Sequence, residues 1–246
     1  MKKMHTHKLA VVARDSRRFI PLEKLFLLPA FLLLLSGLFG RSAAGEDKFT
    51  LAIIPDAQHE TSDSRFEDRL QWLADHREDL NLKMVLQCGD LMNFNDDAQY
   101  AHQSKGLEVL DNAHIPFAMA LGNHDTAAVR VDGGSAAPGN VNANLRNTAK
   151  YNKYFPMSRF GSVTGTFEKG KIDNAYYTFS AGGLNWLVIN LELWARTDVV
   201  DWAKGVVENH PHHNIIFLTH SHLSGDGTIV QNNGGYGNNS PQYVFD

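Results

Sequence analysis

The stretch that decides the interpretation of this chain is Ala118-Met119-Ala120-Leu121-Gly122-Asn123-His124-Asp125. Its four apolar residues predict a short buried strand, and Gly122 permits a sharp turn where that strand ends. The next three side chains offer an amide oxygen, an imidazole and a carboxylate, all of which can bind a cation or move a proton. An ordinary turn is the alternative, because Gly, Asn and Asp are common turn residues without any function.

Three further apolar runs also end in polar side chains. They are Ile53-Ile54-Pro55-Asp56-Ala57-Gln58, Val85-Leu86-Gln87-Cys88-Gly89-Asp90 and Ile215-Ile216-Phe217-Leu218-Thr219-His220-Ser221-His222. Side chains at the ends of separate strands can converge on one site. The recurrence of this pattern therefore favours a functional site over four unrelated turns.

The order of the expected elements predicts an α/β fold. We expect strands at 48–55, 83–87 and 115–121, with helices at 64–79 and 98–111 between them, the second capped by Asp96 or Asp97. Alternating strands and helices indicate a parallel sheet, in which ligands gather at the carboxyl ends of the strands.

The second half of the chain predicts another sheet. Residues 176–180 and 186–190 alternate around Gly182-Gly183, which is typical of a hairpin. A helix through Val207, capped by Thr197 or Asp198, and a strand at 215–218 follow. Residues 126–160 carry no clear pattern and predict a long surface loop.

Taken in order, these motifs resemble the calcineurin-like metallophosphoesterase family. The family pattern is D-x-H, G-D-x-x-[DN], G-N-H-[DE], a lone His and then G-H-x-H. This chain resembles it at Asp56, Gly89 to Asn93, Gly122 to Asp125 and His220, over residues 49 to 246. The resemblance implies a four-layer α/β/β/α sandwich with mixed sheets. G-H-x-H is absent, and Ser240-Pro241 predicts the start of a helix shortly before the chain stops, so we expect a partial domain over 45–246, incomplete at its C-terminus.

The resemblance also implies two divalent metal ions, with Mn, Fe or Zn as candidates. The metal ligands expected from it are Asp56, Gln58, Asp90, Asn123 and His220. Asp90 is the expected bridge, because its two oxygens can serve both ions at a separation of about 3.5–4 Å. The chain departs from the family at Gln58, where the family has His. Gln58 can coordinate through its amide oxygen or hold a metal-bound water, and His59 is the alternative ligand.

The implied reaction is metal-dependent hydrolysis of small phosphate monoesters or diesters by a metal-bridging hydroxide. In this interpretation His124 is the catalytic residue that stabilises the transition state or protonates the leaving oxygen, with Asn93 or Asp125 orienting its ring. His222 is expected on the substrate side or at the surface. The competing hypothesis is a truncated, non-catalytic remnant or ligand-binding module with the same fold.

Histidine-rich segments elsewhere give no second site. The metallo-β-lactamase pattern H-x-H-x-D-H fails after His220-Ser221-His222, because Ser224 and Gly225 stand where Asp and His are needed. His210, His212 and His213 surround Pro211 and predict a solvated turn.

The first 44 residues predict a cleaved signal peptide. Basic residues precede the apolar run Leu25 to Gly40, and Ser42-Ala43-Ala44 places small residues before Gly45. This run of about 16 residues is shorter than the roughly 20 of a membrane-spanning helix, so we expect no stable span after cleavage. Ser16-Arg17-Arg18 faintly resembles a twin-arginine signal, but the apolar core favours the general secretory route.

An extracytoplasmic location, periplasmic or secreted, follows from this leader. Residues 1–44 hold eight Lys/Arg and two Asp/Glu, which leaves 15 basic and 25 acidic residues in the remainder. An acidic chain without basic runs argues against dedicated nucleic-acid binding. Cys88 is the single cysteine, so no internal disulfide forms.

We predict that the exported protein begins at or near Gly45. Intact-mass spectrometry of material recovered outside the cytoplasm should give a mass lacking the first 44 residues. A mature N-terminus well upstream of residue 40, or intact chain in the cytosol, would contradict the leader assignment.

Overall fold

A computed structural model describes residues 48–133 and 136–223, all within one compact unit that spans residues 44–246. The expected leader at 1–44, Ser240-Pro241 and the expected C-terminal incompleteness lie outside the described residues. None of the helices in the described part of the chain has both the length and the apolar composition needed to cross a membrane.

The first sheet is parallel, as predicted. Strands β1 (Thr50–Ile54), β2 (Leu82–Gln87) and β3 (Phe117–Met119) lie in that order. Helices α1 (Arg65–Asp75) and α2 (Asp97–Asn112) connect them. The Asp96 side chain accepts a hydrogen bond from the Gln99 N–H and caps α2. Helix α1 ends before the predicted residue 79, because the chain turns back toward β2 through Asn81, whose φ is +47°.

The second sheet is mixed and contains the predicted hairpin. Its strands are β4 (Val163–Thr166), β5 (Ala175–Ala181), β6 (Leu184–Asn190) and β7 (His213–Leu218). The first two pairings are antiparallel, whereas β6 and β7 run parallel through helix α5 (Thr197–Glu208). The expected side-chain cap of α5 is wrong, because Arg196 occupies the N-cap position and its side chain makes no capping bond.

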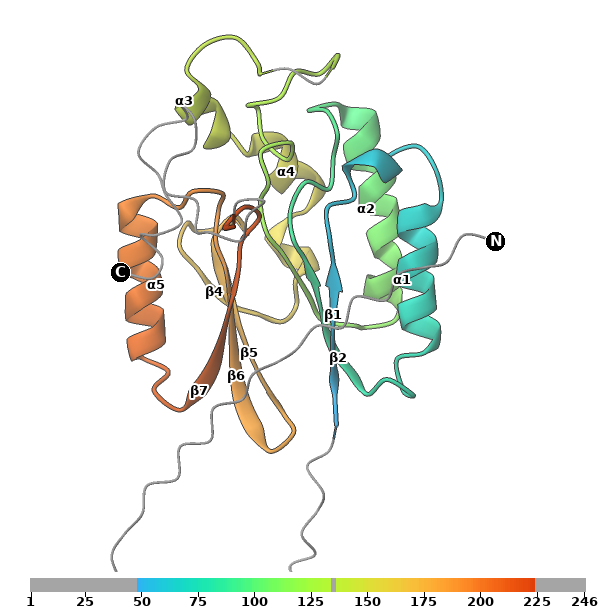
Figure 1. Ribbon diagram of the computed structural model, residues 1–246, viewed down its shortest axis with the longest axis vertical. Coiled ribbons are helices and arrows are strands. Elements are labelled where there is room, and N and C mark those ends of the chain that lie inside the picture. The colour runs from blue at the N-terminus through green and yellow to red at the C-terminus, as the bar shows by residue number, and fades with distance from the viewer. Residues whose placement is uncertain (1–47, 134–135, 224–246) are drawn as a thin grey trace, which may run out of the picture. The chain divides into compact units, whose positions relative to one another are not determined.

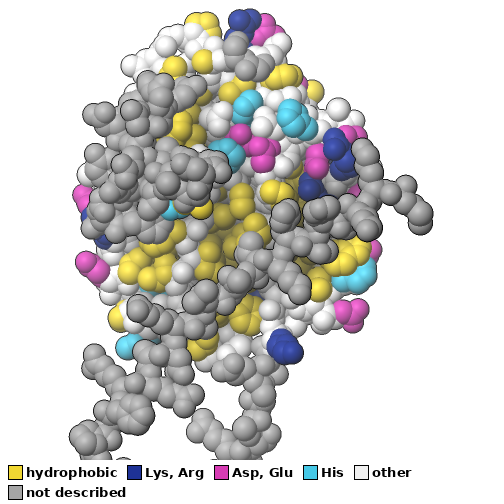
Figure 2. All heavy atoms as spheres, viewed as in Figure 1, with side chains coloured by type: hydrophobic (Ala, Val, Ile, Leu, Met, Phe, Trp, Pro, Cys, Tyr) yellow, Lys and Arg dark blue, Asp and Glu magenta, His cyan; other side chains and the backbone are white. Residues whose placement is uncertain are grey.

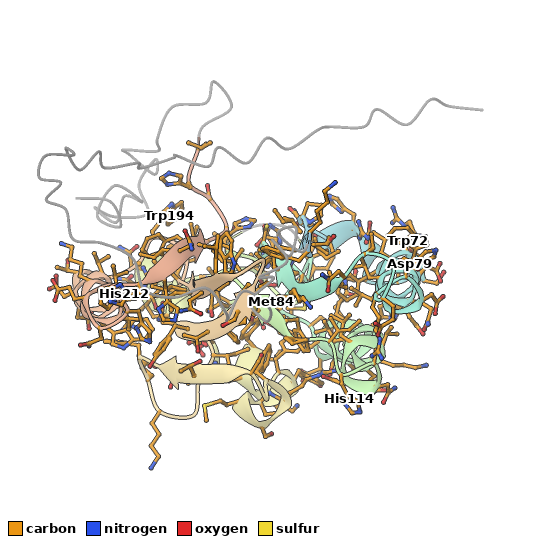
Figure 3. All side chains as sticks on the ribbon, turned by 90° about the horizontal axis from the view of Figure 1, so that it is seen from below. Trp72, Asp79, Met84, His114, Trp194 and His212 are labelled. Carbon is orange, nitrogen blue, oxygen red and sulfur yellow. The ribbon has the colours of Figure 1, made fainter. Side chains whose placement is uncertain are left out.

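The elements stack in four layers, which confirms the predicted α/β/β/α sandwich (Figure 1). One apolar core lies between the first sheet and helices α1 and α2, and another lies between the second sheet and α5. A third core fills the space between the sheets, where Met84 and Leu86 pack with Tyr177 and Val188. Seen from below, Met84 lies centrally, whereas Trp72 lies on the outer α1 side (Figure 3).

The segment predicted as a long loop contains short helices instead. They are α3 (Val141–Leu145), α4 (Ala149–Tyr154) and the 3₁₀ helix η2 (Met157–Arg159). Elements this short carry too few residues for a helical period to stand out in the sequence. Packing against the core holds these helices in place, because Tyr151 and Phe155 are fully buried beside α2.

Candidate active site

Four polar residues follow the carboxyl ends of strands. Three come after the parallel strands of the first sheet, and the fourth comes after β7 of the second sheet. Asp56 follows β1, Asp90 follows β2, Asn123 follows β3 and His220 follows β7. Ligand sites in open α/β sheets form at such strand ends. Figure 2 shows histidine and acidic side chains grouped on the upper part of one face, above a hydrophobic region.

The Asp125 carboxylate is the centre of the hydrogen bonding at this end of the sheet. It is fully buried, and it accepts bonds of 2.8 Å from the backbone N–H groups of Gly122, Asp90 and Leu91, and one of 3.2 Å from Met92. Burial raises the pKa of Asp125 to about 6, the nearby Asp90 carboxylate adds to the rise, and the N–H groups of Gly122 and Met92 oppose it. One side chain thereby joins the loop after β2 to the loop after β3.

Two glycines allow these loops to touch. A Cβ on Gly122 would lie 2.0 Å from Asp90 Oδ1, and a Cβ on Gly89 would lie 2.8 Å from the Gly122 nitrogen. Gly89 also has a φ of +89°, and Asp90 has a φ of +51°, which is uncommon for a residue with a side chain. Gly89 is therefore required by both its positive φ and its lack of space, and Gly122 is required because a Cβ there would collide with Asp90.

Asp90 and His220 form a direct pair across the two sheets. His220 Nε2 lies 3.2 Å from Asp90 Oδ2, and His220 Nδ1 lies 2.9 Å from the Cys88 carbonyl oxygen. Donation from Nδ1 to that carbonyl leaves Nε2 as the nitrogen directed at the carboxylate. Burial lowers the pKa of His220, but the hydrogen bond to Asp90 and its charge prevail and raise it to about 9.

His124 is held through both its backbone and its ring. Its backbone N–H donates to Asp90 Oδ1 at 2.9 Å, and its Nδ1 lies 2.6 Å from the Asn93 carbonyl oxygen. The ring is therefore oriented by the backbone of Asn93, one of the two residues expected to do so. Both oxygens of the other, Asp125, accept hydrogen bonds from backbone N–H groups. With Nδ1–H donating to the carbonyl, Nε2 remains to act as proton donor or acceptor.

Asp56 and Gln58 form a separate pair at the end of β1. The Gln58 backbone N–H donates to Asp56 Oδ1 at 2.9 Å, and Gln58 Nε2 donates to Asp56 Oδ2 at 3.0 Å. Gln58 opens the 3₁₀ helix η1 (Gln58–Glu60), and the neighbouring His59 side chain is exposed. The Ala57 backbone N–H bonds to the Asp90 carbonyl at 3.1 Å, which ties this turn to the loop after β2.

The expected metal ligands are thus only partly brought together. Among the described residues, no three His, Cys, Asp or Glu side chains gather closely enough to hold one ion. Asp90 touches His220, and Asp56 touches Gln58, while Asn123 and His222 are both half-buried in the loops after β3 and β7. Ligand roles for these residues stay predictions.

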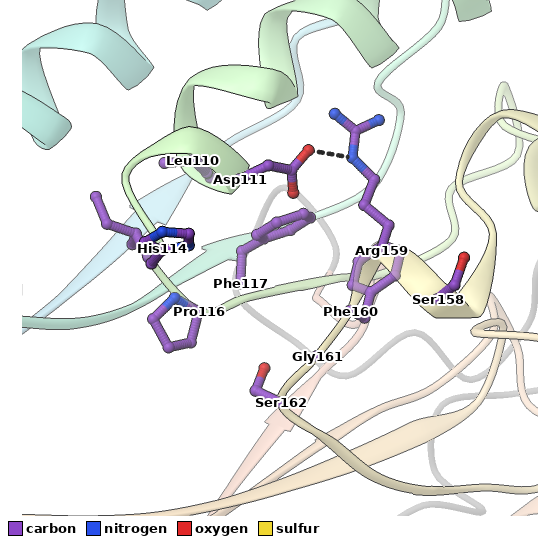
Figure 4. A pocket seen from close by; sticks show the side chains of 11 residues that line it. Leu110, Asp111, His114, Pro116, Phe117, Ser158, Arg159, Phe160, Gly161 and Ser162 are labelled. Atoms are coloured by element: carbon purple, nitrogen blue, oxygen red, sulfur yellow. Dashed lines mark hydrogen bonds and ion pairs between the residues drawn. The ribbon is translucent and has the colours of Figure 1, made fainter.

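A cavity of about 630 Å³ lies elsewhere, at the opposite end of β3 (Figure 4). It is lined by residues that precede or begin β3, including His114 and Phe117, and by the segment around Phe160. Its guanidinium, on Arg159, is already paired with Asp111 at 2.7 Å. Because the polar cluster lies at the carboxyl ends of the strands, we place the site there and not in this cavity.

Comparison with known proteins identifies the family. The sequence pattern of the calcineurin-like phosphoesterases matches residues 49–242. The chain belongs to the calcineurin-like phosphoesterase family. Membership of this phosphoesterase family supports phosphoester hydrolysis as the general type of reaction.

Two relatives illustrate how far the similarity extends. The chain is 25% identical over 185 residues to YvnB, an uncharacterized protein of Bacillus subtilis (strain 168), and the match covers 72% of this chain but 13% of YvnB. A crystal structure of a 5'-nucleotidase precursor from Thermus thermophilus matches with a TM-score of 0.40 and 17% identity, over 70% of this chain and 36% of that one.

We predict that Gly122→Ala destabilises the fold by about 1–3 kcal/mol, because the new methyl group must displace the Asp90 carboxylate or the loop that carries it. The matched control is Gly205→Ala in α5, where a Cβ meets nothing within 4 Å. Removing a helical glycine at an open position should stabilise the protein by about 0.5–1 kcal/mol. Urea unfolding of both variants measures the difference, and similar changes in both would show that Gly122 has room for a side chain.

Proposed function

We propose that this protein hydrolyses small phosphate monoesters or diesters in a metal-dependent reaction at the cluster of Asp90, His220 and His124. The observation that carries the proposal is that Asp90 offers one oxygen to the His220 imidazole and the other to the His124 N–H. A buried carboxylate, a fixed imidazole and a second oriented imidazole are the groups this chemistry uses.

The donor atoms fit divalent cations. His220 has its Nδ1 engaged by a carbonyl oxygen, the arrangement that metal-ligating histidines adopt. Asp90 Oδ2 faces His220 Nε2, and Asn123 follows β3, the strand that pairs with the strand before Asp90. Asp90, Asn123 and His220 would hold one cation, and Asp56 and Gln58, with Asp90 shared between them, a second. Bound divalent cations supply a nucleophile at neutral pH and neutralise charge on the phosphoryl oxygens.

The protein's own part is to position and to move protons. Asp125 fixes the loop that carries Asp90, and the Asn93 carbonyl fixes the His124 ring with Nε2 as its second functional atom. In this proposal Nε2 gives a proton to the leaving oxygen or donates a hydrogen bond to a phosphoryl oxygen. Export to an extracytoplasmic compartment, which the expected leader supports, would direct the activity to phosphate esters outside the cytoplasm.

We predict that Asp90→Asn lowers metal content and kcat more than Gln58→Ala does. Asparagine keeps the shape of the side chain and can still accept from the His124 N–H, but it removes the charge that two cations would share. Gln58 serves at most one cation. Metal content by mass spectrometry and kcat should be measured on both variants, and equal losses would rule out a bridging role for Asp90.

We predict that His124→Ala keeps near-normal metal content while kcat falls by about 10²–10⁴, the usual contribution of a positioned proton donor. His212→Ala is the matched control, because His212 is an exposed histidine in the turn before β7 and should leave both quantities unchanged. Loss of metal in His124→Ala would move His124 into the ligand set.

The choice of leaving group distinguishes two roles for His124, namely proton donation to the leaving oxygen and stabilisation of charge on the phosphoryl group. A nitrophenyl phosphate leaves with little protonation, whereas an alkyl phosphate needs a proton, so proton donation predicts a smaller loss on the nitrophenyl ester. Equal losses on both would favour stabilisation of phosphoryl charge. A wild-type protein that binds metal and phosphate esters without turnover would favour the competing hypothesis of a ligand-binding module.

A further inference from the structure

A short loop of the second sheet emerges beside the segment that carries His220. It covers residues 191–196, follows β6 and leads into α5. The Leu191 N–H donates to the Leu218 carbonyl oxygen at 2.9 Å, which continues the pairing of β6 with β7 one residue past the end of β6. Since His220 lies two residues after Leu218, the 191–196 loop borders the candidate site on this side.

A second connection joins this loop to the segment after β3. Arg146 Nη1 donates to the Leu193 carbonyl oxygen at 2.8 Å, and Arg146 Nη2 donates to the Trp194 carbonyl oxygen at 2.6 Å. The carbonyl oxygen of the residue after Arg146 accepts a 3.0 Å hydrogen bond from the Ala127 N–H. Because Ala127 lies three residues after His124, Arg146 links the two histidine-bearing segments of the site.

Arg146 is itself fixed by a buried charge. Its Nη1 lies 3.3 Å from Oε1 of Glu192, whose side chain is almost fully buried. Glu192 also accepts hydrogen bonds from Arg196 Nε at 2.8 Å and from Asn174 Nδ2 at 3.1 Å. A guanidinium is planar and presents its donors in a rigid fork, so a paired guanidinium can hold two successive carbonyl oxygens in one orientation. The loop backbone therefore has one defined conformation.

Trp194 lies in this loop in a conformation that large side chains rarely adopt. Its φ is +48°, in the left-handed region that favours glycine. The indole packs against the small apolar cluster of Ala128, Leu145 and Leu193, and it is half-buried. Such strain persists only where the surroundings enforce it, and it is concentrated at functional sites. Partial burial does not explain the largest side chain at this position, so we looked to the part of the ring that stays at the surface.

We propose that Trp194 contacts the leaving group of the substrate and makes the site prefer phosphate esters that carry a flat aromatic group. The inference rests on the proposed function, because it names the substrate class of that same site. An indole offers a rigid, flat surface, and an aromatic ring gains more from packing against it than its apolar area alone provides. Arg146 is a positioning residue, since it acts by holding the backbone that carries the indole.

Binding of three phosphonates tests this without turnover. Phenylphosphonate, cyclohexylphosphonate and methylphosphonate share the anionic group, have no ester bond to hydrolyse, and differ in flatness and size. Isothermal titration of the full chain supplied with Mn²⁺ should give the tightest binding with phenylphosphonate. Trp194→Gly suits the backbone conformation, and it should weaken phenylphosphonate about 2- to 10-fold, the contribution of one aromatic pair, while methylphosphonate hardly changes. Trp194→Phe should retain most of the preference.

The matched control is Trp72→Ala. Trp72 is 53% exposed and stacks on His76 at 4.4 Å between ring centroids, on the outer α1 side (Figure 3). An equal loss of phenylphosphonate affinity in this variant would show that any exposed indole binds the probe and would overturn the assignment. Equal affinities of wild type for phenylphosphonate and cyclohexylphosphonate would overturn the preference for a flat ring.

Variants of Arg146 separate positioning of the indole from general support of the fold. Arg146→Ala should lower the ratio of phenylphosphonate to methylphosphonate affinity, whereas a merely structural role would weaken all three phosphonates in the same proportion. Arg146→Lys should recover part of the ratio, because an ammonium can bind one of the two carbonyl oxygens. A proportional loss in Arg146→Ala would rule out the positioning role.

Failure of the proposed function gives a different result. If wild type supplied with Mn²⁺ binds none of the phosphonates and does not hydrolyse nitrophenyl phosphate, the phosphate site is misplaced and both proposals fail. If the phosphonates bind and the ester is hydrolysed, but Trp194→Gly leaves the ratio of phenylphosphonate to methylphosphonate affinity unchanged, the site stands and only the role of Trp194 fails.

Discussion

The site depends on one buried carboxylate whose hydrogen bonds all go to backbone. Asp125 gathers four N–H groups from the loops after β2 and β3. A buried charge is costly unless it is fully bonded, and a carboxylate that accepts several N–H groups meets that condition. Removal of this acceptor would leave four buried donors without a partner, so the positions of Asp90, Gly122 and His124 all follow from it. The Tyr100 hydroxyl, which donates to the Asp125 carbonyl oxygen, anchors the same residue to α2.

Strand direction explains why the polar residues meet at one edge. Because β1, β2 and β3 are parallel, the residues after each strand emerge together, and β7 delivers His220 to the same edge from the second sheet. The cores on either side of each sheet hold the strands in place, but they do not themselves select the polar residues. Packing therefore places the loops, and a few polar contacts arrange the side chains within them.

Much of this arrangement could be predicted from the sequence because it depends on local patterns. The apolar runs predicted β1, β2 and β6, Asp96 indicated the start of α2, and Gly182-Gly183 indicated the hairpin. Contacts between distant segments could not be predicted this way. The Cys88 carbonyl that holds His220 lies 132 residues away in the chain, and backbone carbonyls carry no sequence signal. The partners of Asp125 could not be predicted for the same reason, since they are backbone groups and not the adjacent ring.

The contact of His220 with the Cys88 carbonyl and Asp90 joins the last strand of one sheet to the middle strand of the other. Neither sheet alone can assemble the pair, so the two halves must dock before it exists. A ligand that binds only the docked state stabilises that state by mass action. A ligand bound across the His220–Asp90 pair would therefore also stabilise the packing of the two sheets against each other.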